Sequence, residues 1–133
     1  MTETAKLIRR YYDAFNAKDW DGMLDYVSED IRHDVNEGER RGGKAAFREF
    51  LAKMNRCYDE RLEDIVVMVD ETGGHAAAEF VVHGRYLTDD PGLPKAHGQT
   101  YVLPVGAFLD VADGKIARVT TYYNLKDWIA QVS

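Results

Sequence analysis

Hydrophobic side chains change their period partway along this chain. Near the start, Leu7, Ile8, Tyr11 and Phe15 recur at three- and four-residue spacing, which is typical of one buried helix face. From Leu62 onward the period is two, which is typical of strands with one face in a core. Helices followed by an antiparallel meander predict an α+β fold. We expect a cone-like barrel of a curved, mostly antiparallel sheet wrapped on three N-terminal helices, with a short C-terminal helix.

The order of elements follows from these periods and from the residues that interrupt them. Helices are expected over about the first fifteen residues, after a capping Asp19, and from about Lys44. A short strand is expected at Ile31–Val35, and the polar stretch 36–43 predicts a loop. The long strands are expected at Leu62–Asp70, Ala76–Leu87, Gln99–Val111 and Ile116–Tyr123, and Asn124 is expected to cap a last helix.

The length and charge of the chain limit its organisation and its partners. Its 133 residues fit a single domain spanning 1–133. A net charge of −6 argues against nucleic acid as a partner, because phosphate backbones are bound by clustered Lys and Arg.

Cys57 is the only cysteine, so an internal disulfide is impossible and a reducing compartment is expected. The sequence has no signal-peptide core and no run of about 20 apolar residues, which predicts a cytoplasmic protein without a membrane partner.

The strand expected at 99–111 is apolar on both of its faces. We expect Val102, Pro104, Gly106 and Phe108 to face the helices and the alternate row to face outward. A small antiparallel sheet usually shows one polar face to water, and little chain remains to cover a second apolar face. The outward row therefore predicts a homodimer packed through the sheet. Its members are Tyr101, Leu103, Val105, Ala107 and Leu109.

The strand expected at 76–87 alternates more clearly between apolar and polar residues. Phe80, Val82, Gly84 and Tyr86 are expected to face the interior. The opposite row consists of Glu79, His83 and Arg85. We expect these residues to form ion pairs at the dimer interface rather than to act in catalysis.

Familiar catalytic and cofactor-binding motifs are absent from the sequence. Neither serine lies in a G-x-S-x-G turn, and Cys57 fits a buried structural thiol. His33, His75, His83 and His97 show no H-x-x-x-H or H-x-H spacing. No glycine-rich segment matches a phosphate loop or a dinucleotide fingerprint. The sequence therefore predicts neither a metal nor a cofactor.

Aromatic and phenolic side chains are spread over several of the expected elements. They either fill the core or line a cavity between the cupped sheet and the helices. Such a cavity suits a small hydrophobic molecule with one or two polar groups. The candidate ligand-binding residues are Phe15, Val35, Phe50, Met54, Phe80, Val82, Tyr86, Phe108, Thr121, Tyr123 and Trp128. The loop 89–98 is either a lid over this cavity or a plain hairpin connection.

The stretch 32–38, RHDVNEG, places several polar groups close together. Alternation along a strand turns His33 and Val35 to the interior and Asp34 away from it, unless a bulge intervenes. His33 is then either a proton acceptor or donor suited to neutral pH, or a core histidine bonded to a backbone carbonyl. The stretch therefore yields one candidate, His33, and one conditional candidate, Asp34.

Two segments of the chain resemble a known enzyme family. RYYDAFNAKDWDG, at 10–22, and GKAAFREF, at 43–50, resemble ketosteroid isomerase and the wider SnoaL-like, nuclear-transport-factor-2-like superfamily. GQTYVLPVGAF and GKIARVTTYYN most resemble the proteins called ketosteroid isomerase-related. This scaffold hosts isomerases, cyclases, dehydratases, epoxide hydrolases and noncatalytic binders, so the resemblance specifies the fold better than the reaction.

The catalytic residues of ketosteroid isomerase carry over only in part. In that enzyme an aspartate moves the proton, while a tyrosine and a protonated aspartic acid hold the oxyanion. The resemblance implies that Tyr11 occupies the position of the oxyanion tyrosine. The protonated aspartic acid falls on Gly106 and the base on Val35, and neither can take that role. A shift of one residue would supply Asp34 as the base.

These departures argue against a standard ketosteroid isomerase. The resemblance implies a cofactor-independent isomerase, cyclase or dehydratase that acts by proton transfer on a hydrophobic, steroid- or polyketide-like carbonyl compound. His33 is the expected base, Tyr11 the oxyanion donor, and Asp34 orients or replaces His33. The alternative is a noncatalytic ligand-binding or interaction domain on the same scaffold.

Overall fold

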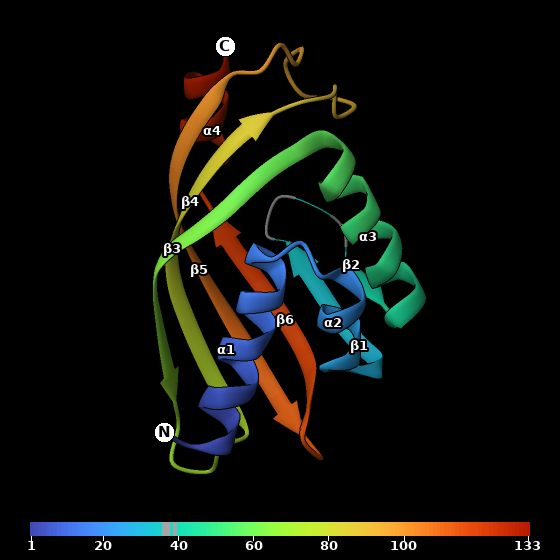
Figure 1. Ribbon diagram of the computed structural model, residues 1–133, viewed down its shortest axis with the longest axis vertical. Helices are drawn as coiled ribbons and strands as arrows, with labels where there is room; N and C mark the ends of the chain where they lie inside the picture. The colour runs from blue at the N-terminus through green and yellow to red at the C-terminus, as the bar shows by residue number, and fades with distance from the viewer. Residues whose placement is uncertain (36–37, 39) are drawn as a thin grey trace.

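Three helices lie inside the curve of a single sheet in the computed structural model (Figure 1). The structure describes residues 1–35, 38 and 40–133. The helices are α1 (Glu3–Asn16), α2 (Trp20–Asp25) and α3 (Lys44–Cys57), and a fourth, α4 (Leu125–Val132), packs on the sheet near the C-terminus. The expected caps are present: the side chain of Asp19 accepts a hydrogen bond from the backbone N–H of Gly22, and that of Asn124 from Asp127.

The sheet has six strands in the order β2-β1-β6-β5-β4-β3. The pairing of β1 with β6 is parallel, and every other neighbouring pair is antiparallel. The fold class is therefore confirmed as α+β, with β2 and β3 as the two edges of an open sheet rather than a closed barrel. The strands are β1 (Val27–Val35), β2 (Arg40–Gly42), β3 (Tyr58–Val69), β4 (His75–Tyr86), β5 (Thr100–Ala112) and β6 (Lys115–Tyr123).

Three strand boundaries differ from the sequence-based expectation. β1 begins at Val27, because Val27 pairs with Ile116 before the ladder is interrupted and resumes at Arg32. The stretch expected to be a loop contains β2, which pairs with residues 32–34 of β1. β3 begins at Tyr58, directly after α3, because Tyr58 already pairs with Tyr86 of β4. In all three cases backbone pairing with a distant strand extends the element beyond its local hydrophobic pattern.

The predicted orientation of β5 was wrong. Tyr101, Leu103, Ala107 and Leu109 are buried against the helices, whereas Phe108 is 50% exposed on the outer face. The orientation follows from the pairing with β4, because directly paired residues point to the same face of a sheet. On β4 three of the four predicted inward residues, Phe80, Val82 and Tyr86, are buried. The partners of Phe80, Val82 and Gly84 on β5 are Val105, Leu103 and Tyr101.

Gly84 of β4 makes room for the ring of Tyr101, its direct partner on β5. A Cβ atom added at Gly84 would lie 2.3 Å from a ring carbon of Tyr101. Gly106, by contrast, sits on the outer face with nothing within 4 Å of an added Cβ.

None of the helices in the described part of the chain is both long and apolar enough to cross a membrane.

Candidate functional site

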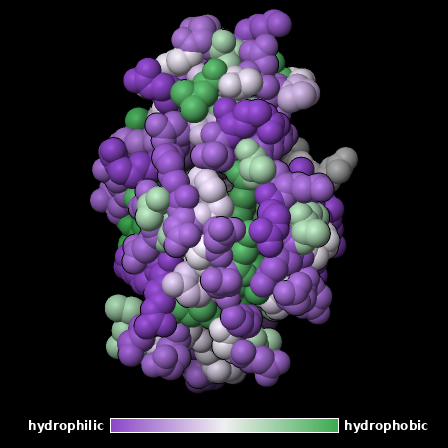
Figure 2. Space-filling model, turned by 45° about the vertical axis from the view of Figure 1, so that its right-hand side comes forward, coloured by the Kyte–Doolittle hydropathy of each residue, from purple (hydrophilic) through white to green (hydrophobic). Residues whose placement is uncertain are grey.

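A cavity of about 360 Å³ lies between the concave face of the sheet, helices α1 and α3, and the loop that follows β4. Figure 2 shows apolar atoms at the bottom of a furrow between hydrophilic side chains on this side of the molecule. The volume and the apolar lining are those of a site for a small organic molecule. The sequence-predicted residues that line it are Tyr11, Phe15, His33, Val35, Phe50, Met54, Phe80, Val82, Thr121, Tyr123 and Trp128.

Two of the predicted ligand-binding residues do not line the cavity. Tyr86 is fully buried behind it, and its ring stacks on Tyr58 and meets the edge of Trp128. Its hydroxyl donates a hydrogen bond to the backbone carbonyl of Pro94, so it supports the wall rather than forming it. Phe108 lies on the outer face and packs edge-on against Tyr122, because the orientation of β5 is the reverse of that expected.

Asp34 lies on the outer side of β1, away from the cavity. Residues 32–35 pair in unbroken register with β6, and the bulge that could have turned Asp34 inward occurs earlier in the strand. Its Oδ2 accepts a hydrogen bond from Thr120 and lies 3.4 Å from Nε of Arg32. Simple alternation along the strand therefore holds, as expected without a bulge, and the conditional role of Asp34 beside His33 finds no support.

His33 reaches the cavity from β1 and is only 4% exposed. Its ring packs against Phe47 and Phe50, with centroid distances of 4.8 and 4.4 Å. Burial, followed by the positive charge of Arg41, lowers the pKa of His33 to about 4, although Asp34 acts in the opposite direction. The imidazole is therefore neutral at physiological pH, which differs from the group suited to proton transfer near neutrality that the sequence suggested.

The Nδ1 atom of His33 is buried and has no hydrogen-bond partner among the described residues. At this nitrogen the structure does not support the second interpretation that the sequence left open, a core histidine bonded to a backbone carbonyl. A buried polar atom without a protein partner is uncommon, and such an atom is explained by a bound water or ion, by strain or by a catalytic role.

Tyr11 and Tyr12 enter the cavity from consecutive positions of α1, and their rings meet edge-on at 5.0 Å. The hydroxyl of Tyr12 is buried without a hydrogen-bond partner among the described residues. Burial raises the pKa of both phenols well above the ordinary value, so both remain protonated and able to donate. Sequence reasoning found Tyr11 and missed Tyr12, although a helix places consecutive residues about 100° apart, within one wide buried face.

Glu60 is a cavity residue that sequence reasoning also missed. It lies on the inner face of β3, two residues from Tyr58 and two from the buried Leu62. The ladder to β4 is irregular between Glu63 and Val66, and this bulge changes which residues face inward along the rest of the strand. The signal that could have identified Glu60 is the alternation in burial at residues 58, 60 and 62. It begins before Leu62, where the sequence placed the start of the strand.

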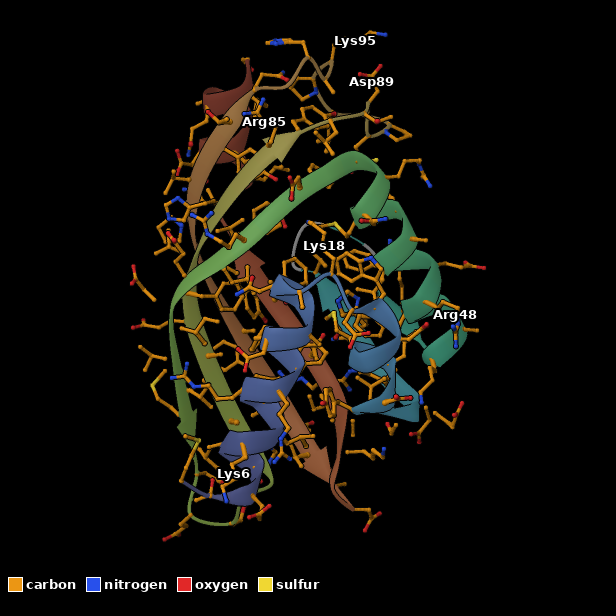
Figure 3. The ribbon with its side chains drawn as sticks, viewed as in Figure 1. Lys6, Lys18, Arg48, Arg85, Asp89 and Lys95 are labelled. Atoms are coloured by element: carbon orange, nitrogen blue, oxygen red, sulfur yellow. The ribbon has the colours of Figure 1, made fainter. Side chains whose placement is uncertain are left out.

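Asp90 closes the cavity from the loop between β4 and β5, in which Figure 3 labels Asp89 and Lys95. Its Oδ2 accepts a hydrogen bond of 2.6 Å from the hydroxyl of Tyr58, and its Oδ1 lies 2.9 Å from Nζ of Lys53 on α3. Both carboxylate oxygens of Asp90 are therefore engaged by the protein. These contacts attach the loop to the beginning of β3 and to α3.

The positions matched to the two missing groups of ketosteroid isomerase are apolar in the structure. Val35 lines the cavity, and it has no group that moves a proton. Gly106 faces outward, so the nearest cavity residues of β5 are Leu103 and Val105. Among the described residues, no three His, Cys, Asp or Glu side chains are grouped so that they could hold a metal ion.

Two solved structures share most of their sequence with this chain. A provisionally assigned polyketide cyclase from Pseudomonas putida KT2440 is 62% identical, with a TM-score of 0.96, over 100% of this chain and 99% of its own. A second provisionally assigned polyketide cyclase, from Xanthomonas campestris pv. campestris, is 57% identical, with a TM-score of 0.95, over 98% of this chain and 97% of its own.

More distant structures share the fold alone. An LEH-like epoxide hydrolase from M. tuberculosis is 15% identical, with a TM-score of 0.74, over 98% of this chain and 89% of its own.

None of the proteins of curated function matches this chain. The model of the SnoaL-like domain matches residues 8–119, which confirms the superfamily that the sequence resembled. The chain belongs to the family of SnoaL-like domains.

Proposed function

We propose that this protein is an enzyme of isomerase or cyclase type, which catalyses proton transfer on a small, mostly apolar carbonyl compound bound in the cavity. The family and the provisional assignment of two close relatives as polyketide cyclases support a reaction of this class. The cavity supports a substrate with few polar groups, because most of its lining is aliphatic or aromatic.

One observation carries the proposal: two residues that line the same apolar cavity each have a buried polar atom without a hydrogen-bond partner among the described residues. These atoms are Nδ1 of His33 and the hydroxyl oxygen of Tyr12. A ligand polar group within reach of either atom would form a hydrogen bond with it and remove the cost of leaving it unpaired. Because both side chains are neutral at physiological pH, the fitting group is a carbonyl or hydroxyl group rather than a carboxylate.

The same groups suit the charge that develops during enolisation. Removing a proton next to a carbonyl places negative charge on the carbonyl oxygen, and fixed donors in a water-poor site stabilise that charge. Tyr11 and Tyr12 supply phenolic donors, and a neutral imidazole at His33 polarises the carbonyl when its N–H donates a hydrogen bond to the oxygen. His33 thus changes from the base that the sequence predicted to a hydrogen-bonding group.

The experiment uses 2-tetralone, a small bicyclic ketone with acidic α-protons. Exchange of these protons for deuterium is followed by NMR in D₂O, and binding is measured separately by titration of the protein's chemical shifts. We expect the protein to bind 2-tetralone and to accelerate exchange above the buffer rate. Tyr12→Phe is expected to slow exchange by about 10- to 1000-fold, the usual loss for one oxyanion donor. Tyr122→Phe, which removes a hydroxyl from the outer face, is the matched control.

Two results would contradict this function. Binding of 2-tetralone without accelerated exchange would identify a noncatalytic ligand-binding domain, the alternative that the sequence left open. Absence of binding would show that the cavity does not accept compounds of this class.

We also propose that two copies pack through the outer face of the sheet. Val102, Phe108 and Tyr122 are each about half exposed there. Glu79 and Arg85 are exposed on the neighbouring strand β4 and carry opposite charges. A two-fold axis allows such a face to pair with itself, since each acidic group can meet a basic group of the other copy.

A further inference from the structure

Glu60 and His33 line the cavity from strands on opposite sides of the sheet. His33 is on β1 and Glu60 on β3, with β6, β5 and β4 between them. Since neighbouring strands lie about 4.8 Å apart, the two strands are separated by roughly 19 Å along the sheet, and its curvature turns both toward one cavity. A bound molecule would therefore have an imidazole on one side and a carboxyl group on the other.

The Glu60 carboxyl group is held in a defined position without an ion pair. Its Oε2 accepts a short hydrogen bond from the hydroxyl of Tyr101, a buried residue of β5. Lys18, which Figure 3 labels at the end of α1, lies nearby, but its ammonium group contacts Oδ1 of Asp59 at 2.6 Å. No salt bridge to Glu60 is found in the described part of the chain. One carboxylate oxygen is therefore positioned by Tyr101, and the other has no protein partner there.

The surroundings of Glu60 raise the pKa of its carboxyl group. Phe15, Trp20 and Met54 line a small hollow beside the cavity together with Glu60. Burial raises the pKa of Glu60 above its ordinary value, and the negative charge of Asp59 adds to this effect. The hydrogen bond from Tyr101 and the charge of Lys18 act in the opposite direction without cancelling it. A carboxyl group with a raised pKa is better matched to proton transfer near neutral pH than an ordinary glutamate.

We infer that Glu60, and not His33, is the general base and acid of the proposed reaction. This inference rests on the proposed function. The ionised carboxylate takes the α-proton of the bound ketone, and the electrons of the broken C–H bond form the C=C bond of an enolate. The negative charge moves to the oxygen, which the phenols of α1 stabilise by hydrogen bonds. Glu60, now protonated, returns the proton to another carbon in an isomerisation. In the exchange assay the protonated Glu60 first exchanges its proton with D₂O and then returns a deuteron to the same carbon.

The first experiment compares Glu60→Gln with the wild type in the 2-tetralone exchange assay. Gln has the size of Glu and can still accept the hydrogen bond from Tyr101, but it cannot take a proton. We expect exchange to slow by about 100-fold or more, while the dissociation constant changes by less than about 3-fold. Glu71→Gln, which removes the same charge from an exposed position in the turn between β3 and β4, is the matched control and should exchange at the wild-type rate.

A second measurement does not depend on turnover. Carbon-13 NMR of the glutamate carboxyl groups, assigned by the signal missing in Glu60→Gln, gives the titration of Glu60 directly. We expect its midpoint to lie clearly above that of an ordinary glutamate. Tyr101→Phe should raise the midpoint further, because it removes a hydrogen bond that favours the charged form. The rise of the exchange rate with pH should move to higher pH in the same variant.

The outcomes separate this inference from the proposed function. Wild-type exchange that persists in Glu60→Gln would leave the function standing and overturn the role of Glu60. An ordinary or lowered midpoint for Glu60 would overturn that role whatever the exchange rate is. Binding without exchange in the wild type, combined with a raised Glu60 midpoint, would contradict the proposed function and show that the buried carboxyl group serves binding alone.

Discussion

The hydroxyl of Tyr58 donates a hydrogen bond of 2.6 Å to Oδ2 of Asp90, and this contact joins the first residue of β3 to the loop between β4 and β5. The opposite oxygen of the same carboxylate contacts Lys53, so the loop is attached to two elements at once. The sequence left open whether this loop is a lid or a plain connection. Its attachment favours a fixed wall, because opening it would separate an ion pair and a charge-assisted hydrogen bond.

Removing the Tyr58 hydroxyl should therefore destabilise the protein. We expect Tyr58→Phe to lower the free energy of unfolding by about 1.5 to 3 kcal/mol, the usual range for a hydrogen bond to a charged group. Urea denaturation measures the change, with Tyr122→Phe as the control, since Tyr122 lies half exposed on the outer face. Equal stability of the two variants would show that the contact between Tyr58 and Asp90 does not secure the loop.

The lowered pKa of His33 predicts that acid destabilises the protein. The pKa falls from an ordinary 6.5 to about 4 in the folded state, so the unfolded chain binds more protons between these pH values. The stability from this residue is thus fully present above pH 6.5 and is lost as the pH falls toward 4. The full loss amounts to about 3 kcal/mol, at about 1.4 kcal/mol per pKa unit.

His33→Gln isolates this effect, because glutamine does not titrate. Urea denaturation of the variant should show a weaker loss of stability between pH 6.5 and 4 than the wild type shows. An NMR titration of the imidazole provides a direct check. A midpoint near 6.5 would contradict both the burial argument and the neutral role that we propose for His33.

Local patterns were sufficient to predict the helices. Capping by Asp19 and Asn124, and the helical spacing of apolar residues, depend on positions a few residues apart. The inward position of His33 also follows from simple alternation along β1. These features need no knowledge of distant parts of the chain, so the sequence was enough to predict them.

The orientation of β5 could not be predicted in this way. Both faces of the strand are apolar, and its pairing with β4 decides which of them is buried. Glu60 was missed for a related reason. The pairing of Tyr58 with Tyr86 extends β3 back to the end of α3. The bulge after Glu63 then reverses which alternate residues face inward, so the pattern after the bulge gives the wrong inner face for residues before it. Both features depend on long-range register, which composition and local spacing do not specify.

The contact between Gly84 and Tyr101 can be tested with a pair of glycine substitutions. Gly84→Ala places a methyl group against the Tyr101 ring, and we expect a loss of about 1 to 3 kcal/mol, the usual cost of overpacking. Gly106→Ala on the adjacent strand has open space around the new methyl group and should not be destabilising. Thermal unfolding distinguishes the two variants. A Gly84→Ala protein as stable as Gly106→Ala would show that the Tyr101 ring moves aside at little cost.

The outer face of the sheet provides the test of the proposed homodimer. Phe108 is 50% exposed and packs edge-on against Tyr122, so an aspartate at position 108 would place a charge in the apolar centre of the interface. We expect the wild type to have the mass of a dimer by light scattering at micromolar concentration, and Phe108→Asp to have that of a monomer. Leu87→Asp is the control, because Leu87 is similarly exposed but lies just beyond the end of β4. A monomeric wild type, or a Phe108→Asp protein that remains dimeric, would show that copies of this chain do not associate through this face.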